Sequence, residues 1–284
     1  MSTTARELRA PARPGKGTAA PGGAGRLGSR FAYSFGLLIV LLVLWQAATA
    51  LNPSPFFPTP LKIGTHAWKM FFGAKDGALL TDAMAEHTLQ TLGRVLLAFV
   101  LGSVAGILLG TATGLYRVLR DATDPVVEFL RSVPATATLP LFIVLLGGED
   151  SMRVAFIAYG ISWYVLINTA NGVGAIHPTQ LAMGKAFRLS KWRTLTGIIL
   201  PAALPKIFAG LRLALTGALM FAIVSEFMLA TNGIGFQLIQ SQARFQILDM
   251  WAWMLLLAVL GLLLNSVLEA IEHRLLAWHR LARS

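Results

Sequence analysis

The sequence predicts an all-α integral membrane protein with about six transmembrane helices, and two observations lead to this fold class. Of the 284 residues, 55% are hydrophobic and only 13% are charged, whereas a soluble domain carries about 25% charged residues. The apolar residues also fall into runs of about 20, the length that a helix needs to cross a bilayer core. The formal net charge of +11 then indicates basic cytoplasmic loops rather than nucleic-acid binding.

The N-terminal part divides into two segments. Residues 1–30 are rich in Ala, Gly, Pro and Arg and predict a disordered cytoplasmic tail. Gly15–Thr18 has some likeness to a phosphate loop, but it lacks the first glycine and follows no strand. Residues 31–86 should hold the first transmembrane helix, Phe31–Leu51, and an external segment that begins with the proline-rich stretch after Leu51. A secretory signal is the alternative, but the apolar run is too long and has no convincing cleavage site.

The second predicted span runs from His87 to Tyr116 and contains a glycine every four residues. On a helix these glycines form one smooth stripe, and close backbone approach drives helix association in lipid. We therefore expect a tight helix contact there, although glycine is also generally enriched in membrane helices. The helix-packing candidates are Gly102, Gly106, Gly110 and Gly114.

The third predicted span, from about Asp124 to Leu146, is interrupted by Pro134 and Pro140. A helix broken by proline frees backbone carbonyls, and such a break can line a transport pathway. A packed kink satisfied by the hydroxyls of Thr136 and Thr138 is the alternative. Pro134, Thr136 and Thr138 are pathway candidates on the first interpretation.

The fifth predicted span, Lys206–Leu229, carries Arg212 near its inner end and Glu226 near its outer end. About 21 Å of helix rise separates the two, so they cannot pair with each other. Arg212 is expected to extend toward the cytoplasm or to bind a partner. Glu226 is expected to meet another helix or an external vestibule, and it is a further pathway candidate. The sixth span follows at Leu248–Ala270.

The fourth span, Met152–Val173, leads into a polar and basic stretch, Asn168–Pro205, between two apolar segments. His177-Pro178-Thr179 predicts the start of a short helix, because proline favours the first turn. The apolar residues that follow are spaced three to five apart on one side. Basic residues fill the other side: Lys185, Arg188, Lys191 and Arg193. The simplest alternative is an ordinary amphipathic loop in some other membrane protein.

The end of this stretch matches a known pattern: E-A-A, three residues, Gly, nine residues and Ile-x-Leu-Pro. Ile198, Leu200 and Pro201 match, and the spacing places Ala182-Met183-Gly184 on E-A-A and Arg188 on the Gly. The stretch therefore resembles the cytoplasmic loop of binding-protein-dependent ABC importer permeases, and its flanks resemble the nitrate/sulfonate/taurine branch. The candidates for ATPase coupling are Ala182, Met183, Gly184, Lys185, Phe187, Arg188, Ile198, Leu200 and Pro201.

The resemblance extends from about Leu89 to Leu276 and implies a type I ABC importer permease-like fold with a cytoplasmic coupling helix. It implies a permease core at residues 87–276, a cytoplasmic C-terminal tail at 277–284, and both termini inside the cell (inner) membrane. The implied partners are a pair of cytoplasmic ATP-binding subunits, an external or periplasmic solute-binding protein, a second permease copy as a homodimer, and membrane lipid. The implied solute is a small anion such as a sulfonate, taurine or nitrate.

The sequence offers no chemistry of its own for catalysis. There are no cysteines, so disulfides and zinc–thiolate sites are excluded. No P-loop, catalytic triad or paired-carboxylate site is apparent, and we expect no catalytic residue, metal site, cofactor or nucleic-acid partner. ATP hydrolysis is therefore expected in a partner subunit. The alternatives are a stand-alone secondary transporter, for which no clear internal duplication is seen, and a membrane scaffold without transport.

Overall fold

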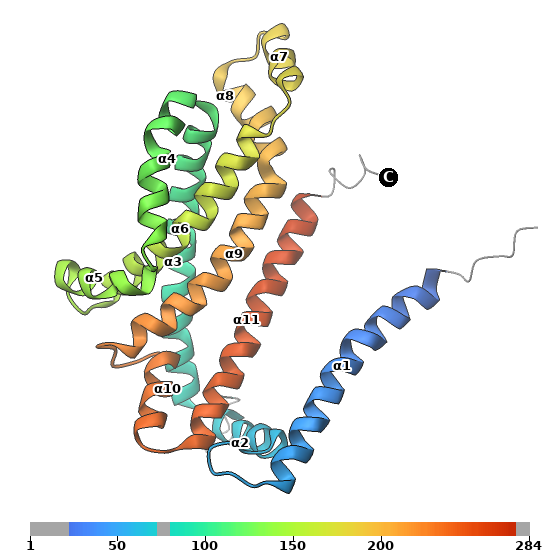
Figure 1. Ribbon diagram of the computed structural model, residues 1–284, viewed down its shortest axis with the longest axis vertical. Coiled ribbons are helices and arrows are strands. Elements are labelled where there is room, and N and C mark those ends of the chain that lie inside the picture. The colour runs from blue at the N-terminus through green and yellow to red at the C-terminus, as the bar shows by residue number, and fades with distance from the viewer. Residues whose placement is uncertain (1–22, 73–79, 277–284) are drawn as a thin grey trace, which may run out of the picture. The chain divides into compact units, whose positions relative to one another are not determined.

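A computed structural model describes residues 23–72 and 80–276 of the chain, and within these residues every regular element is a helix (Figure 1). The chain forms two compact units, Met1–Pro60 and Leu61–Ser284, which are described separately. The helices are α1 (Gly23–Leu51), α2 (Pro60–Phe72), α3 (Asp82–Leu115), α4 (Arg117–Ser132), η1 (Ala135–Thr138), α5 (Leu139–Leu146), α6 (Asp150–Gly174), α7 (Pro178–Ala186), α8 (Lys191–Thr194), η2 (Leu195–Ile199), α9 (Leu200–Phe227), α10 (Ile234–Ala243) and α11 (Ile247–Leu275).

The first unit contains α1, which differs from the predicted boundary. The helix begins at Gly23, inside the segment predicted to be a disordered tail, and it ends at Leu51 as predicted. Proline and serine residues follow directly, and proline cannot continue a helix. The remainder of the predicted tail, residues 1–22, and the predicted C-terminal tail, residues 277–284, lie outside the described residues.

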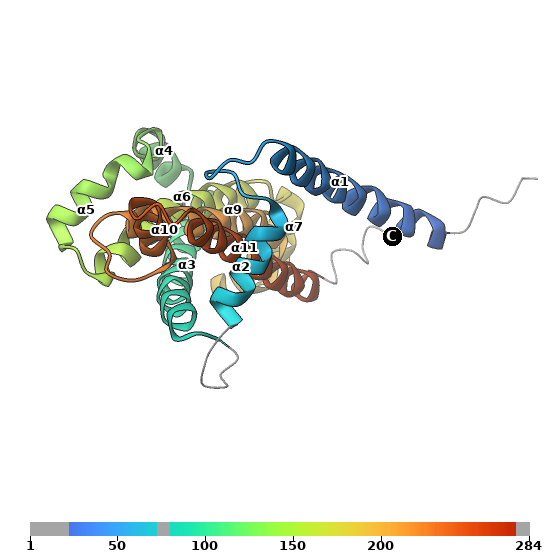
Figure 2. The same cartoon turned by 90° about the horizontal axis from the view of Figure 1, so that it is seen from below.

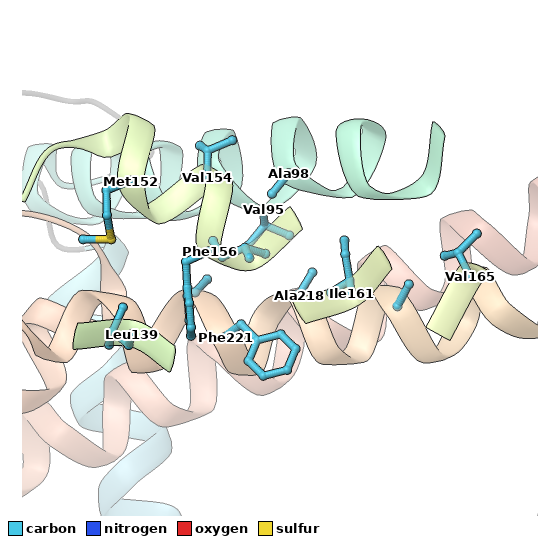
Figure 3. Close-up of a cluster of buried hydrophobic side chains, with 13 residues drawn as sticks. Val95, Ala98, Leu139, Met152, Val154, Phe156, Ile161, Val165, Ala218 and Phe221 are labelled. Carbon is cyan, nitrogen blue, oxygen red and sulfur yellow. The ribbon is translucent and has the colours of Figure 1, made fainter. Parts of the chain in front are cut away.

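The second unit is built around α3, α6 and α9, with α6 packed against both of the others. Figure 3 shows the apolar side chains at their contact, contributed by α3, α5, α6 and α9. Val95, Phe156 and Ala218 are examples from three different helices, and each is fully buried. Since lipid gives no hydrophobic drive for helices to associate, dispersion contacts of this kind hold a membrane bundle together.

Small and large residues of α3 lie on different faces of the helix. Its buried face carries small and polar residues such as Ala98, Gly102 and Gly106. Leu97 and Leu108 instead lie on the outside, with more than half of their surface exposed. A helix with large apolar residues outside and small residues inside is suited to lipid on one side and close packing on the other.

By length and composition, three helical segments of the described chain could cross a membrane: Asp82–Leu115, Lys191–Phe227 and Ile247–Leu275. A fourth is possible if α4 and the segment Ala135–Leu146 form one broken span. The prediction was about six. The predicted first span has a described apolar part of only Gly36–Leu51. The predicted fourth span is α6, which has 25 residues but is not among these apolar helices; its sequence includes polar residues such as Arg153, Asn168 and Asn171.

The predicted third span is not a continuous helix. Helix α4 begins at Arg117 rather than near Asp124, and the axis bends by 85° between Ser132 and Ala135. Pro134 lies at this bend, as predicted for a break. Pro140 does not interrupt a helix but occupies the first turn of α5, where the missing N–H costs nothing.

Pro201 and Pro205 do not end a helix. The chain is helical from Lys191 to Phe227, and both prolines lie within α9. A wide π-helical turn, Leu195–Ile199, precedes Pro201, and the N–H of Leu200 donates to the carbonyl of Leu195. Pro201 lies in the first turn of α9, where the N–H that proline lacks is not needed for a helical hydrogen bond. The π-helical turn just before it changes the backbone hydrogen-bond pattern at Leu195–Ile199.

The two ends of the second unit differ in their elements. Helices α7 and α8 lie at one end and α10 at the other (Figure 1). Figure 2 views the α10 end, where α2, α10 and α11 lie nearest the viewer. Here α2 packs on α11 through Phe71 and Trp253, with ring centroids 5.0 Å apart. Phe71 is buried, whereas Trp68 of the same helix is exposed.

Candidate functional site

The predicted coupling helix is α7, and its first turn is set by local sequence. His177 is the N-cap, and its Nδ1 accepts a hydrogen bond from the backbone N–H of Thr179 at 3.3 Å. Pro178 follows in the first helical position. A side-chain acceptor at the N-cap and a proline after it are both favourable at a helix start. The predicted start at His177-Pro178-Thr179 is therefore confirmed.

The end of α7 is an αL turn built on Arg188. The N–H of Leu189 donates to the Gly184 carbonyl at 3.0 Å, and the N–H of Arg188 donates to the Lys185 carbonyl at 3.0 Å. This pair of bonds is the Schellman arrangement, which needs a left-handed residue after the helix. Arg188 has φ +48°. It stands where the matched pattern has glycine, so the backbone requires there what glycine supplies most easily.

The nine coupling candidates separate into an outer and an inner group. Met183 and Phe187 are 54% and 73% exposed, and Ala182, Lys185 and Arg188 are also exposed. This outer group forms an apolar and basic surface. The inner group packs against the bundle and consists of Gly184, Ile198, Leu200 and Pro201.

Contacts at Gly184 and Leu181 hold α7 against the wide turn. A Cβ atom at Gly184 would lie 3.1 Å from Cδ1 of Ile198. Leu181 packs in the cluster that contains Ile199 and Ala203. Because this turn continues directly into α9, α7 is attached to the end of a core helix rather than to a loose loop.

The bend between α4 and α5 borders a cavity of about 290 Å³. Pro134 and Thr136 line it, together with Arg131. Aromatic residues of α6 and α9 form much of the remaining wall: Tyr159, Trp163, Tyr164 and Phe221. Of the three pathway candidates at the bend, two thus line one cavity. Thr138 does not line it; its hydroxyl donates to the Ala135 carbonyl at 2.7 Å.

The fourth pathway candidate, Glu226, lies in a buried ion-pair network at the α10 end. Its Oε1 accepts from Nη1 of Arg94 at 2.7 Å, and Thr91 donates to the same carboxylate at 2.9 Å. The N–H of Gly235 donates to Oε2 at 2.8 Å. Glu226 has no exposed surface. Partners of this kind are what a charged group inside an apolar bundle requires.

Arg94 extends this network to α6 and to the turn before α10. Its Nη2 bonds Oδ1 of Asp150 at 2.7 Å, and it also donates to the side-chain oxygen of Asn232. Arg153 donates to the same Asp150 oxygen at 2.9 Å. The network therefore joins α3, α6 and α9 at their common end.

Sequence reasoning did not identify this pairing of Arg94 with Glu226. The available signal was that Arg94 and Glu226 are opposite charges within apolar helices, where charged residues usually pair with one another. Arg212 is a similar case, because it pairs with Glu272 of α11. That pair is more open than the Arg94 pair, with 48% of the Arg212 side chain exposed.

The glycine stripe of α3 faces α6 along its whole length. A Cβ at Gly102 would lie 2.7 Å from the Ala158 carbonyl oxygen, and one at Gly106 would lie 2.7 Å from Cβ of Val165. A Cβ at Gly110 would lie 2.5 Å from the Leu166 carbonyl oxygen, and one at Gly114 would lie 2.6 Å from Cβ of Val173. No side chain larger than hydrogen fits at these positions unless the helices separate.

Comparison with known proteins gives a consistent picture. The sequence profile of the family described as "binding-protein-dependent transport system inner membrane component" matches residues 102–277. The chain is 31% identical to the taurine transport system permease protein TauC of Escherichia coli (strain K12) over 87% of this chain and 89% of that one. It is 28% identical to the putative aliphatic sulfonates transport permease protein SsuC of Bacillus subtilis (strain 168), over 88% and 89%. It is 27% identical to the nitrate import permease protein NrtB of Synechococcus elongatus, over 70% and 72%.

The solved structures agree on the fold. A chain of the inward-facing MetNI methionine ABC transporter matches with a TM-score of 0.59 at 16% identity, covering 68% of this chain and 96% of that chain. An amino acid ABC transporter matches with a TM-score of 0.54 at 19% identity, over 66% and 92%. These likenesses concern the fold alone. The family match over residues 102–277 and the 31% identity with TauC establish that this chain belongs to the inner-membrane permease components of binding-protein-dependent ABC transport systems.

Proposed function

We propose that this permease imports a small oxyanion, powered by a separate pair of ATP-binding subunits and supplied by an external solute-binding protein. The names of the relatives support this class of solute, because sulfonates, taurine, nitrate and bicarbonate all carry an oxyanion group. We further propose a homodimer of permeases in the cell membrane, with both termini in the cytoplasm. ATP-driven uptake distinguishes this function from a stand-alone secondary transporter.

The observation that carries the proposal is the outer surface of α7. A helix that exposes Met183 and Phe187 presents apolar surface that a partner protein would cover. Lys185 and Arg188 lie beside it, and neither forms an ion pair within the described part of the chain. Ala182 stands where the family pattern has glutamate and cannot supply a charge. We infer that Lys185 and Arg188 instead bind acidic residues of the ATP-binding subunit.

Coupling then follows from how α7 is attached. Closure of the ATPase pair displaces α7, and the contacts of Leu181 and Gly184 transmit the displacement to the turn Leu195–Ile199 and so to α9. Because α9 packs along α6, the core tilts rather than bending locally. The pathway then alternates between inward-facing and outward-facing states, each favoured by different contacts with the ATPase.

The test reverses the two charges in the full transporter by Lys185→Glu with Arg188→Glu. We expect normal membrane insertion, but at least a tenfold loss of uptake and of the ATPase activity stimulated by the binding protein. Lys191→Glu with Arg193→Glu is the matched control, since it makes the same charge change in α8 and should retain most coupling. Coupled uptake that survives the first double substitution would show that these two residues do not compensate for the missing glutamate.

A further inference from the structure

Three arginines near span ends could attract an anion, and the structure separates them. Arg94 is neutralised by Glu226 and Asp150, each 2.7 Å away. Arg212 is paired with Glu272. Arg131, in the last turn of α4, forms neither a hydrogen bond nor an ion pair among the described residues. Even Glu128, one turn earlier on the same helix, is not paired with it.

The surroundings of Arg131 leave its charge uncompensated. It lines the cavity of about 290 Å³ at the bend, and it is the one charged residue among the described residues that do so. No carboxylate faces it from α5, α6 or α9 across this cavity. Arg131 is exposed, so its charge is accessible to an anion that enters the cavity. The guanidinium group also presents a planar pair of donors that matches oxyanions.

The size and wall of the cavity suit a small organic oxyanion. Its volume of about 290 Å³ lies just below the roughly 300–1,000 Å³ of drug-sized ligand sites, which suits a smaller solute. The rings of Tyr159, Trp163 and Phe221 offer apolar surface for a short carbon chain, and Thr136 adds a hydroxyl. Apolar walls with a few polar groups that set orientation are typical of binding sites for small ligands.

We propose that Arg131 and this cavity form a transient oxyanion-binding site on the transport path, which would give the membrane subunit a selectivity of its own. The inference rests on the proposed import function and names the group that holds the solute. The competing explanation is structural: a basic residue in a last turn also interacts favourably with the helix dipole. The two explanations are separated by measuring whether uptake of the anion depends on a positive charge at position 131.

The first experiment measures taurine and nitrate uptake by proteoliposomes that hold the complete transporter. We expect Arg131→Gln to lower uptake of the transported anion at least tenfold, and Arg131→Lys to lower it less. ATPase activity stimulated by the loaded binding protein should stay within about twofold. Arg117→Gln is the matched control, since Arg117 lies in the first turn of the same helix with 93% of its side chain exposed, and it should leave uptake unchanged.

The second experiment uses the absence of cysteine from the chain. Arg131→Cys should lose uptake, and modification with a positively charged aminoethyl thiosulfonate should restore a substantial part of it. A neutral methyl thiosulfonate should not, and wild-type protein should respond to neither reagent. Unchanged uptake in Arg131→Gln, or equal rescue by both reagents, would overturn the proposed anion site. A wild-type transporter that imports none of taurine, nitrate, an aliphatic sulfonate and bicarbonate would instead contradict the import proposal itself.

Discussion

A single backbone angle at Arg188 connects the sequence pattern with the structure of the coupling helix. The pattern has glycine at this position, and the structure gives Arg188 a φ of +48°. An L-residue in the left-handed region costs roughly 1–2 kcal/mol. The chain therefore accepts backbone strain at a place where it also gains a positive charge on the exposed surface.

Replacing Arg188 with glycine should therefore stabilise the protein while weakening coupling. The released strain of roughly 1–2 kcal/mol exceeds the entropic cost of glycine, which is roughly 0.5–1 kcal/mol, so the expected net gain is about 0–1.5 kcal/mol. Arg188→Ala is the control, because it removes the same charge but retains the Cβ atom. Thermal unfolding in detergent should rank glycine above alanine, and equal melting temperatures would show that the turn is unstrained.

The buried network allows a comparison of two ion pairs that differ mainly in burial. Glu226 is fully buried beside Arg94, whereas Glu272 and Arg212 are partly open to solvent. Breaking a buried pair leaves an uncompensated charge and costs about 3–5 kcal/mol, whereas an exposed pair contributes about 0–1 kcal/mol.

We expect Glu226→Gln to lower the free energy of unfolding by about 3 kcal/mol, near the lower bound because Asp150 still binds Arg94. Glu272→Gln should change it by less than about 1 kcal/mol. Denaturant titration of both variants measures the difference. Similar small effects in the two variants would mean that the buried carboxylate contributes little to holding α3, α6 and α9 together.

At the scale of elements, the glycine stripe shows what periodicity can and cannot predict. Spacing alone indicated that one face of α3 is smooth, but it could not name the neighbour, which is α6. The same glycine-based contact recurs between α6 and α9, where a Cβ at Gly210 would lie 2.8 Å from Cβ of Asn168. Close backbone approach on both sides of α6 makes these three helices one packed body.

Gly106→Leu should force α3 and α6 apart and lower both assembly and uptake. Gly93→Leu is the control on the same helix, because a Cβ at Gly93 would meet no atom within 4 Å. We expect wild-type amounts of the control in the membrane and a clear reduction for Gly106→Leu, measured by size-exclusion chromatography in detergent. Equal behaviour would mean that the contact with α6 is not needed in the membrane.

The prolines mark the limit of prediction from local sequence. Each removes one N–H donor, yet Pro134 lies at an 85° bend while Pro125 and Pro205 lie inside helices. Local sequence cannot predict which proline bends the chain. Whether the missing N–H hydrogen bond disrupts the helix depends on a neighbouring π-helical turn or on how near the proline is to the helix start. The start of α7 was predictable since its signals at His177 and Pro178 are local. The pairing of Arg94 with Glu226 was not, because the two residues come from different helices.

At the scale of the whole molecule, the two ends of the second unit have different chemical characters. The α7 end holds exposed basic residues that lack ion pairs within the described chain, such as Lys185 and Lys191. At the α10 end, Arg94 and Arg153 are buried and paired with acids. Lys69 and Arg244 are exposed there, but they are fewer than the exposed basic residues at the α7 end, which are Lys185, Arg188, Lys191 and Arg193. Unpaired basic residues concentrate on the cytoplasmic side of membrane proteins. This asymmetry supports a cytoplasmic position for α7 independently of the matched pattern.

Single cysteines can test this orientation directly, since the chain has none of its own. Ser190 is the exposed N-cap of α8, just after α7, and Thr231 lies in the exposed turn between α9 and α10; each is replaced by cysteine. Helix α9 separates the two ends by about 42 Å at 1.5 Å per residue, which exceeds the thickness of a bilayer core. A membrane-impermeant maleimide added outside should label Thr231→Cys in intact cells, and Ser190→Cys only after the membrane is opened. The reverse pattern would place α7 outside, where no ATP-binding subunit could reach it, and ATP-driven coupling through this helix would then be impossible.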